Sequence, residues 1–436
     1  MPRWLYFLLI FAVAAPLLDL LFPHLSLLIF AVAGLGIIPL AALIGQSVEE
    51  IAEHTGEGIG GLLFATFGNA TELIISILAL TQGLVDVVRA AIIGTILGNA
   101  LLVLGVAVCV GGFKHGRLKF ETRPAGQYAS LLALCIAGLL LPSIAEILAS
   151  RANQTQIVER GVLLSDFIAV MLLLGYVASV LFSVFHFGDK KPAEASTEEG
   201  KEEEELEPTL GARSAAAITR LLAYRRHLAE SAVPNKSGVL RQIDATVGAI
   251  TDHEANRPDA SKQQTSPSVT SSRGQAQQQH EHKPPLWRGL VVLAVATIGV
   301  AILSEILVGA IDPVTEALHW NQAFVGLVFL PLIGGMPEYF NTISMALDKR
   351  MGMVLAASAG SSIQIALLMA PILVLISLFT LYRLDLVFSI VEIAVLGLAA
   401  FLFSEITQDG ELVWLEGLLL ILLYAMMGGT VFLFGA

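Results

Sequence analysis

Long apolar segments constrain this chain more than any other feature of its sequence. Eleven of them are long enough to cross a lipid bilayer as helices, which takes about 20 residues each. They lie at residues 5–22, 25–48, 59–81, 87–112, 125–149, 161–186, 286–310, 323–347, 351–380, 384–404 and 412–435. Only 14% of the 436 residues are charged, against roughly 25% in soluble globular proteins. The sequence therefore predicts an all-α membrane protein with eleven transmembrane helices rather than a soluble enzyme.

The first segment is the weakest of the eleven. Pro16 and Asp19 interrupt it, and Arg3 followed by an apolar run also resembles a secretory signal peptide. We expect an N-terminal transmembrane helix over residues 1–24, and a cleaved leader is the alternative.

A polar insert at residues 187–285 separates the sixth and seventh segments. It contains a glutamate-rich run, residues 198–205, and a Ser/Gln-rich stretch, residues 261–282, and this composition is typical of disordered chain. Short loops on the side of the N-terminus and the insert carry seven Lys and Arg residues, whereas those on the other side carry four. Because loops rich in Lys and Arg stay in the cytoplasm, the N-terminus and the insert are predicted to be cytoplasmic.

The second half of the chain repeats the first at an offset of 266 residues. Three pairs share this offset: Glu72 with Glu338, Gly94-Thr95 with Gly360-Ser361, and Glu50 with Glu316. Five segments in residues 25–186 thus pair with five in residues 286–436. Since each half has an odd number of segments, the halves cross the membrane in opposite senses. This is the inverted-repeat plan of secondary transporters.

Acidic residues outnumber basic ones by 37 to 25, which gives a net charge of −12. This balance argues against a nucleic-acid partner. The insert holds 15 acids and 13 bases, so most of the surplus lies in the membrane part. Carboxylates in or near a bilayer are costly and commonly handle cations or protons. The alternative is that most of these acids lie in loops at the water surface.

Glu72 and Glu338 lie well inside apolar segments. Helical spacing puts oxygen-bearing side chains one turn away on the same faces: Asn69 and Ser76 beside Glu72, and Asn341 and Thr342 beside Glu338. Oxygen-rich faces suit Ca²⁺, which takes about six to eight oxygen ligands. When the ion leaves such a pair, protons become the competing ligand. The pair therefore predicts cation/proton exchange, and the alternative is a structural glutamate that caps or bonds a helix.

Backbone breaks are expected beside both glutamates. Pro337 cannot donate a hydrogen bond to the carbonyl group of Ile333, and Gly334 weakens the helix further. A freed carbonyl group inside a membrane needs a partner, and a cation is one. Gly68 can play the same part in the first half. The alternative is an ordinary proline kink.

Small-residue clusters at 94–99 and 360–364 permit close helix packing. Packing alone does not explain Asn99 and Gln364, because buried amide groups need partners. We expect these two residues, with Ser361, to contact the site directly or through water.

The motifs resemble those of the calcium/proton exchanger family. The first repeat of that family is similar to residues 48–72, which end in Gly68-Asn69-Ala70-Thr71-Glu72. Its second half is similar to Ser304–Gly309, Phe324–Leu327, Gly360–Ile365 and Trp414–Gly417. The resemblance covers nearly all the membrane segments. It implies eleven helices, with a cytosolic acidic segment between the sixth and seventh that the run 198–205 matches.

The resemblance implies that Glu72 and Glu338 bind Ca²⁺ and protons in turn. It also implies that carbonyl groups near Gly68 and Gly334 help to ligate the ion, with Asn99 and Gln364 close by. The second motif of the family normally reads Gly-Asn-Ala-x-Glu, whereas here it reads Gly-Gly-Met-Pro-Glu. The missing asparagine at position 335 leaves the cation selectivity open, and Asn341 is a candidate substitute.

Four further acids can be compared with the family, and three of them occupy positions that match it. Glu50, Glu305 and Glu316 match and are expected to flank the ion path, with solvated loop acids as the alternative. Asp166 departs, because the family tends towards a basic residue there. We expect Asp166 to make a polar contact near a helix start.

Together these features predict a secondary antiporter that exports cytosolic Ca²⁺ in exchange for protons by alternating access, and not an enzyme. It requires no cofactor, and its partners are the lipid bilayer, Ca²⁺ and H⁺. The alternative is an exchanger of Na⁺ or K⁺ for protons, or of Na⁺ for Ca²⁺, with the same fold. A plasma membrane and an acidic-organelle membrane both stay open as locations, as does assembly into a homo-oligomer.

Overall fold

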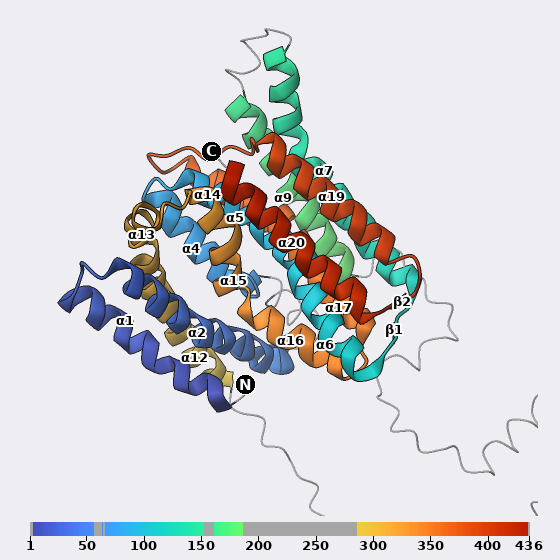
Figure 1. Cartoon of the computed structure of the whole chain (residues 1–436), viewed down its shortest axis with the longest axis horizontal. Helices are drawn as coiled ribbons and strands as arrows, with labels where there is room; N and C mark the ends of the chain where they lie inside the picture. Colours follow the sequence, from blue (N-terminus) through green and yellow to red (C-terminus); the bar gives the residue numbers. More distant parts are fainter. Residues whose placement is uncertain (1–2, 56–62, 64–65, 152–160, 186–285, 435–436) are drawn as a thin grey trace, which may run out of the picture. The chain divides into compact units, whose positions relative to one another are not determined.

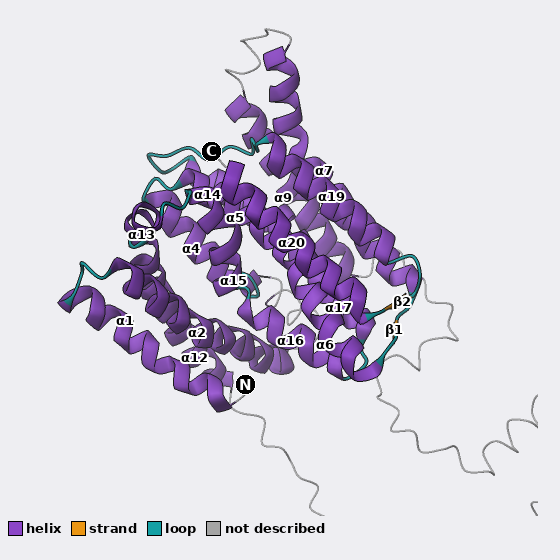
Figure 2. Cartoon of the chain, in the orientation of Figure 1, coloured by secondary structure: helices purple, strands orange, loops and turns teal. Residues whose placement is uncertain are grey.

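The computed structural model describes residues 3–55, 63, 66–151, 161–185 and 286–434. Apart from two short strands, these residues form helices joined by turns and loops (Figure 2). The all-α prediction is therefore confirmed for the described residues. The insert at 187–285, with its run 198–205, lies outside them.

The first half begins with a 3-10 turn, η1, and contains a π-helical stretch, η2. Its elements are η1 (Arg3–Leu8), α1 (Leu9–Leu21), α2 (Ser26–Thr55), α4 (Ala70–Thr81), α5 (Val85–Leu97), η2 (Gly98–Val103), α6 (Leu104–His115), β1 (Leu118–Lys119), α7 (Thr122–Arg151) and α9 (Gly161–Phe185).

The second half contains two π-helical stretches, η3 and η4. Its elements are α12 (Leu286–Gly309), α13 (Ile311–Leu318), α14 (Gln322–Phe324), η3 (Val325–Phe329), α15 (Leu330–Gly334), α16 (Met336–Leu347), α17 (Met351–Gln364), η4 (Ile365–Met369), α18 (Ala370–Ser377), α19 (Ile390–Ile406), β2 (Glu411–Leu412) and α20 (Trp414–Phe434). Strands β1 and β2 pair antiparallel and join the two halves of the chain. Strand β1 follows the end of α6, and β2 precedes the start of α20.

Seven helical spans among the described residues are long and apolar enough to cross a membrane. They number eight if the pair Gln322–Gly334 and Met336–Leu347, which is bent by 58°, counts as one span. The chain is therefore an integral multi-pass membrane protein. The larger count of eleven spans and their inverted arrangement stay predictions.

Helices α1, α2 and α12 pack side by side (Figure 1). Glycines allow close approach, since Gly36 of α2 lies against the α1 backbone and Gly299 of α12 lies against a leucine of α2. The hydroxyl groups of Ser47 and Thr297 donate to carbonyl oxygens four residues earlier in their own helices. These hydroxyl groups are thus satisfied without a neighbouring helix. We call α1, α2 and α12 the three-helix group.

Hydroxyl groups join several of the other helices across their interfaces. Ser358 and Ser362 of α17 donate to the carbonyl oxygens of Asn99 and Ile96, in and beside η2. Tyr424 of α20 donates to a carbonyl oxygen of η3 at 3.2 Å. A π turn frees carbonyl groups from regular helical pairing, so these hydroxyl groups satisfy acceptors that the turns leave exposed.

The loop between α18 and α19, residues 378–389, is fixed by side chains of α7 and α9. Arg383 donates to both carboxylate oxygens of Asp166 in α9, at 2.9 and 2.8 Å. Ser143 of α7 accepts from the N–H of Phe388 at 2.8 Å and donates to the carbonyl oxygen of Leu386 at 3.0 Å. The polar contact predicted for Asp166 is therefore confirmed as an ion pair.

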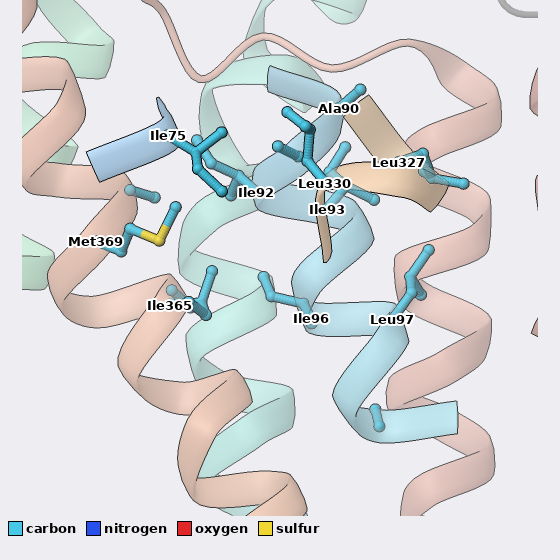
Figure 3. Close-up of a cluster of buried hydrophobic side chains, with 14 of the residues drawn as sticks. Ile75, Ala90, Ile92, Ile93, Ile96, Leu97, Leu327, Leu330, Ile365 and Met369 are labelled. Atoms are coloured by element: carbon cyan, nitrogen blue, oxygen red, sulfur yellow. The ribbon is translucent and has the colours of Figure 1, made fainter. Parts of the chain in front are cut away.

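Helix α5 and the π turn η3 cross at backbone contact distance. A Cβ atom on Gly94 would overlap the carbonyl group of Leu327, and one on Gly326 would overlap the carbonyl oxygen of Val87. Figure 3 shows the buried cluster around this crossing, with side chains from α4, α5, η3, α15 and η4. The two halves of the chain thus share one apolar core, and this crossing sets their separation.

Gly94→Ala and Gly326→Ala are each expected to destabilise the protein by about 1–3 kcal/mol, because overpacking a core forces the backbone to shift. Thermal unfolding of the purified protein in detergent measures the effect. Gly397→Ala is the matched control, since a Cβ atom there meets nothing within 4 Å. An equal unfolding temperature for all three variants would contradict the close crossing.

Candidate functional site

Glu72 and Glu338 each follow a break in an apolar helical segment. A turn at Gly68–Asn69 precedes α4, and the second segment bends by 58° at Gly334–Gly335. Asn69 is the N-cap residue of α4, one turn before Glu72, and its carbonyl oxygen accepts from the N–H of Leu73 at 3.1 Å. The helix thus begins directly after Asn69, and the preceding Gly68 disfavours its continuation in that direction.

The breaks place both carboxyl groups in the first turn of a helix. Glu72 lies in the first turn of α4, and Glu338 lies in the first turn of α16. The free N–H groups and the helix dipole at such an end favour negative charge. This arrangement offsets part of the cost of placing two acids within the apolar core.

Glu72 packs directly against the break of the second half. A Cβ atom on Gly334 would lie 2.9 Å from Cγ of Glu72, and one on Gly335 would lie 3.8 Å from its Oε1 atom. The motifs of the two halves therefore meet, and Gly334 leaves the space that the Glu72 side chain occupies.

The site holds more acceptors than donors. Oε2 of Glu72, Oε2 of Glu338 and Oδ1 of Asn69 are all buried without a hydrogen-bond partner among the described residues. The amide of Asn69 donates from Nδ2 to Oε1 of Gln364 at 2.9 Å, which leaves its oxygen free. Buried acceptors without donors are costly. A proton or a cation would satisfy them.

The other predicted residues surround this pair in different ways. Gln364 contacts Asn69, as described above. Asn99 instead accepts a hydrogen bond from Ser358 of α17 through its backbone carbonyl oxygen. Thr342 donates to the carbonyl oxygen of Glu338 at 2.7 Å, so it supports the first turn of α16. Ser76 is buried on α4, one turn after Glu72, and Ser361 is half-buried.

A cavity of about 150 Å³ reaches the site beside α2. Its lining includes Gly68, Glu338 and Asn341, which the sequence predicts as site residues, together with Gln46 and Glu49 of α2. Glu49 is exposed and borders this cavity. Sequence reasoning missed Gln46, although an amide within an apolar run was a usable signal.

None of the three predicted path acids lines the cavity beside Glu338. Oε1 of Glu50 accepts from Nε2 of Gln46 at 3.3 Å. Glu305 and Asp19 line a separate pocket of about 350 Å³ beside the ends of α1 and α12. Glu316 is exposed on α13. Glu50 thus connects to the cavity through Gln46, whereas Glu305 and Glu316 belong to another region.

Few charged side chains are available to bind a cation at this site. Within the described ranges, no group of three or more His, Cys, Asp or Glu side chains gathers in a way that could hold a metal ion. Any cation bound here would therefore rely on two carboxylates together with neutral carbonyl and amide oxygens.

Comparison with known proteins places this geometry in context. A family profile described as sodium/calcium exchanger protein matches residues 25–185 and 288–433. The chain is 32% identical to a Ca(2+)/H(+) antiporter of Synechocystis sp., over 92% of this chain and 89% of the relative. It is 30% identical to the Ca(2+)/H(+) antiporter ChaA of Bacillus subtilis, over 94% of this chain and 93% of the relative.

Solved structures agree with these sequence matches. The structure of native YfkE aligns with a TM-score of 0.67 and 26% identity, covering 98% of this chain and 99% of that one. The structure of the H+/Ca2+ exchanger CAX aligns with a TM-score of 0.58 and 12% identity, covering 99% and 91%. The second match is a similarity of fold alone.

Glu72→Gln and Glu338→Gln are each expected to raise the unfolding temperature of the metal-free protein at alkaline pH. An amide carries no charge and brings an N–H donor to a donor-poor site, which is worth about 1–3 kcal/mol. Thermal unfolding in detergent with a chelator measures this.

Glu121→Gln, at an exposed position before α7, is the control and should leave the unfolding temperature unchanged. Lower unfolding temperatures for both site variants would show that the two carboxylates already have partners.

Proposed function

Since the chain belongs to the sodium/calcium exchanger protein family, we propose that it is a secondary antiporter that exports cytosolic Ca²⁺ in exchange for protons by alternating access. The relatives from Synechocystis sp. and Bacillus subtilis, both named Ca(2+)/H(+) antiporters, align over 92% and 94% of this chain. The observation that carries the proposal is the pair Glu72 and Glu338, placed at two helix breaks with buried acceptor oxygens that lack donors.

The exchange follows from what can satisfy these oxygens. One Ca²⁺ ion is neutralised by the two carboxylates, and Oδ1 of Asn69 adds a neutral ligand. When the ion leaves, two ionised carboxylates in a poor solvent are unfavourable, so protons take its place. Ca²⁺ and protons thus exclude one another at the same atoms, and this exclusion is the physical basis of antiport.

The surrounding residues support the pair. Gly68 and Gly334 make the backbone breaks, and Gln364 orients the amide of Asn69. Thr342 supports the first turn of α16. We assign supporting positions to the remaining predicted residues near the pair: Ser76, Asn99, Asn341 and Ser361.

The transport cycle requires two halves that open alternately. We propose eleven membrane helices: one N-terminal helix over residues 1–24 and two inverted five-helix repeats over 25–186 and 286–436, joined by a cytoplasmic insert over 187–285. The π turns η2 and η4 lie at matching positions of the two repeats, which supports this arrangement. The three-helix group, with its apolar packing, is the part that shifts against the rest.

The ion site is bordered by a cavity on one side. The cavity beside Glu338 is lined by Leu5 and Glu49, on the side that we propose to be cytoplasmic. Glu72 is only 5% exposed.

The repeat-equivalent residues of the second half have different surroundings. Asp312, which matches Gln46, is exposed and accepts from Nε2 of Gln322 at 2.8 Å. Ile311 is fully buried, whereas the matching Gly45 of α2 is half-buried and lines the cavity. This difference supports alternating access, because inverted repeats place matching residues at opposite faces.

A second candidate is the exchange of Na⁺ or K⁺ for protons, or of Na⁺ for Ca²⁺. The observation that favours it is Gly335, where the family motif has asparagine. A Cβ atom on Gly335 would lie 2.7 Å from the carbonyl oxygen of Pro331, so the backbone here leaves no room for an amide side chain. The second half thus supplies one neutral ligand fewer.

Proteoliposomes with an acidic interior test the proposal. Ca²⁺ uptake is expected on imposing the pH gradient and is expected to stop when a protonophore removes it. Glu72→Gln and Glu338→Gln should each lower the uptake by more than about 100-fold, since removing the carboxylate partner of a buried cation costs roughly 3–5 kcal/mol. Glu121→Gln is the control and should transport normally.

A panel of cations in the same vesicles separates the candidates. Uptake of Na⁺ or K⁺ in place of Ca²⁺, or uptake that follows a Na⁺ gradient instead of the pH gradient, would favour the second candidate. Ca²⁺ uptake that survives in both glutamate variants would refute the mechanism.

A further inference from the structure

Gln46 has an amide that the rest of α2 does not satisfy. Its Nε2 atom donates to Oε1 of Glu50, one turn later in the helix, at 3.3 Å. Its Oε1 atom is buried and has no hydrogen-bond partner among the described residues. The bond to Glu50 fixes the orientation of the amide, so the oxygen is the atom left over. Keeping an unpaired carbonyl group within an apolar helix is costly and calls for an explanation.

Gln46 shares its surroundings with the proposed ion site. It lines the same cavity of about 150 Å³ as Gly68, Glu338 and Asn341. Four buried unpaired side-chain atoms of the described residues are acceptor oxygens of this region, on Gln46, Asn69, Glu72 and Glu338. Three of them belong to the glutamate pair and its neighbour. The side-chain oxygen of Gln46 is thus buried and unpaired, as are the oxygens that we assign to the ion.

We propose that Gln46 is a specificity-determining residue that supplies a neutral oxygen from α2 to the divalent cation held at Glu338. This inference rests on the proposed function. Asn341, which lines the same cavity, carries the other neutral amide on this side. A neutral oxygen at this point makes up for the ligand that Gly335 does not provide. It favours a divalent ion, which needs more oxygen ligands than two carboxylates supply.

The position of Gln46 also links the ion to movement of the helices. Gln46 lies on α2, a member of the three-helix group, whereas Glu72 and Glu338 lie on α4 and α16. An ion that contacts all three helices holds the three-helix group against the site. The repeat-equivalent residue, Asp312 of α13, lies outside the three-helix group and is bonded to Gln322. In this conformation Gln46 is therefore the residue of this matched pair that borders the ion site.

Transport by three variants in proteoliposomes tests the role of Gln46. Gln46→Met keeps the length of the side chain and removes the carbonyl group. It is expected to raise the KM for Ca²⁺ about tenfold with little change in maximal rate, because a contact between a polar group and a charge is lost. Gln46→Glu keeps the oxygen but loses the donor to Glu50, and its KM should be equal to or below that of the wild type.

Gln82→Met, at the exposed end of α4, is the matched control and should leave the KM unchanged. Equilibrium binding of Ca²⁺ to the purified protein in detergent gives a second readout, with the same expected order of affinities. It also keeps the test decisive if one variant transports poorly for lack of folded protein.

Two outcomes overturn the inference. One is a wild-type KM and affinity for Gln46→Met. The other is the same rise in KM for Gln46→Glu as for Gln46→Met, which would mean that Gln46 acts by holding Glu50. Failure of the proposed function looks different, because then the wild-type protein itself would not take up Ca²⁺ against a pH gradient.

Discussion

Two carboxyl groups, each with one buried oxygen that lacks a hydrogen-bond donor, are the constraint on which the rest of this structure depends. Oε2 of Glu72 and Oε2 of Glu338 have no hydrogen-bond partner among the described residues. The helix breaks, the glycine at 334 and the bond between Asn69 and Gln364 all serve to hold these oxygens in place. A site of this kind is least favourable when it is empty and ionised. Binding of either a cation or protons therefore stabilises the folded protein as well as starting transport.

The two halves of the chain are unequal where they meet. Asn69 and Gln364 form a hydrogen bond across the halves, but the residues at their repeat-equivalent positions are Gly335 and Gly98. One side of the site thus has an amide pair and the other has bare backbone. Gly98 has room for a Cβ atom, whereas Gly335 does not, because of the carbonyl oxygen of Pro331. The chemistry of the site is therefore not symmetric, even though its two acids are.

Much of this arrangement could be predicted from the sequence, because apolar length and a repeated acidic motif are local signals. They gave the helical membrane architecture, the glutamate pair and the family. The contact partners could not be predicted. Ser358 and Ser362 bond the π turn η2, although Ser361 was the residue expected to matter. The amide of Gln46 within an apolar run is a signal in the sequence, but its place beside the site depends on a cavity shared with α16. Such contacts depend on how distant helices cross.

The crossing of Gly94 and Gly326 has a consequence for the making of this protein. The groove beside Gly94 is filled by the backbone of Leu327, a residue that the ribosome adds long after α5 has emerged. Until the second half is inserted, the first half displays Glu72 and an unfilled groove to lipid or to the insertion machinery. The glutamate pair thus exists only once both halves have been synthesised and docked.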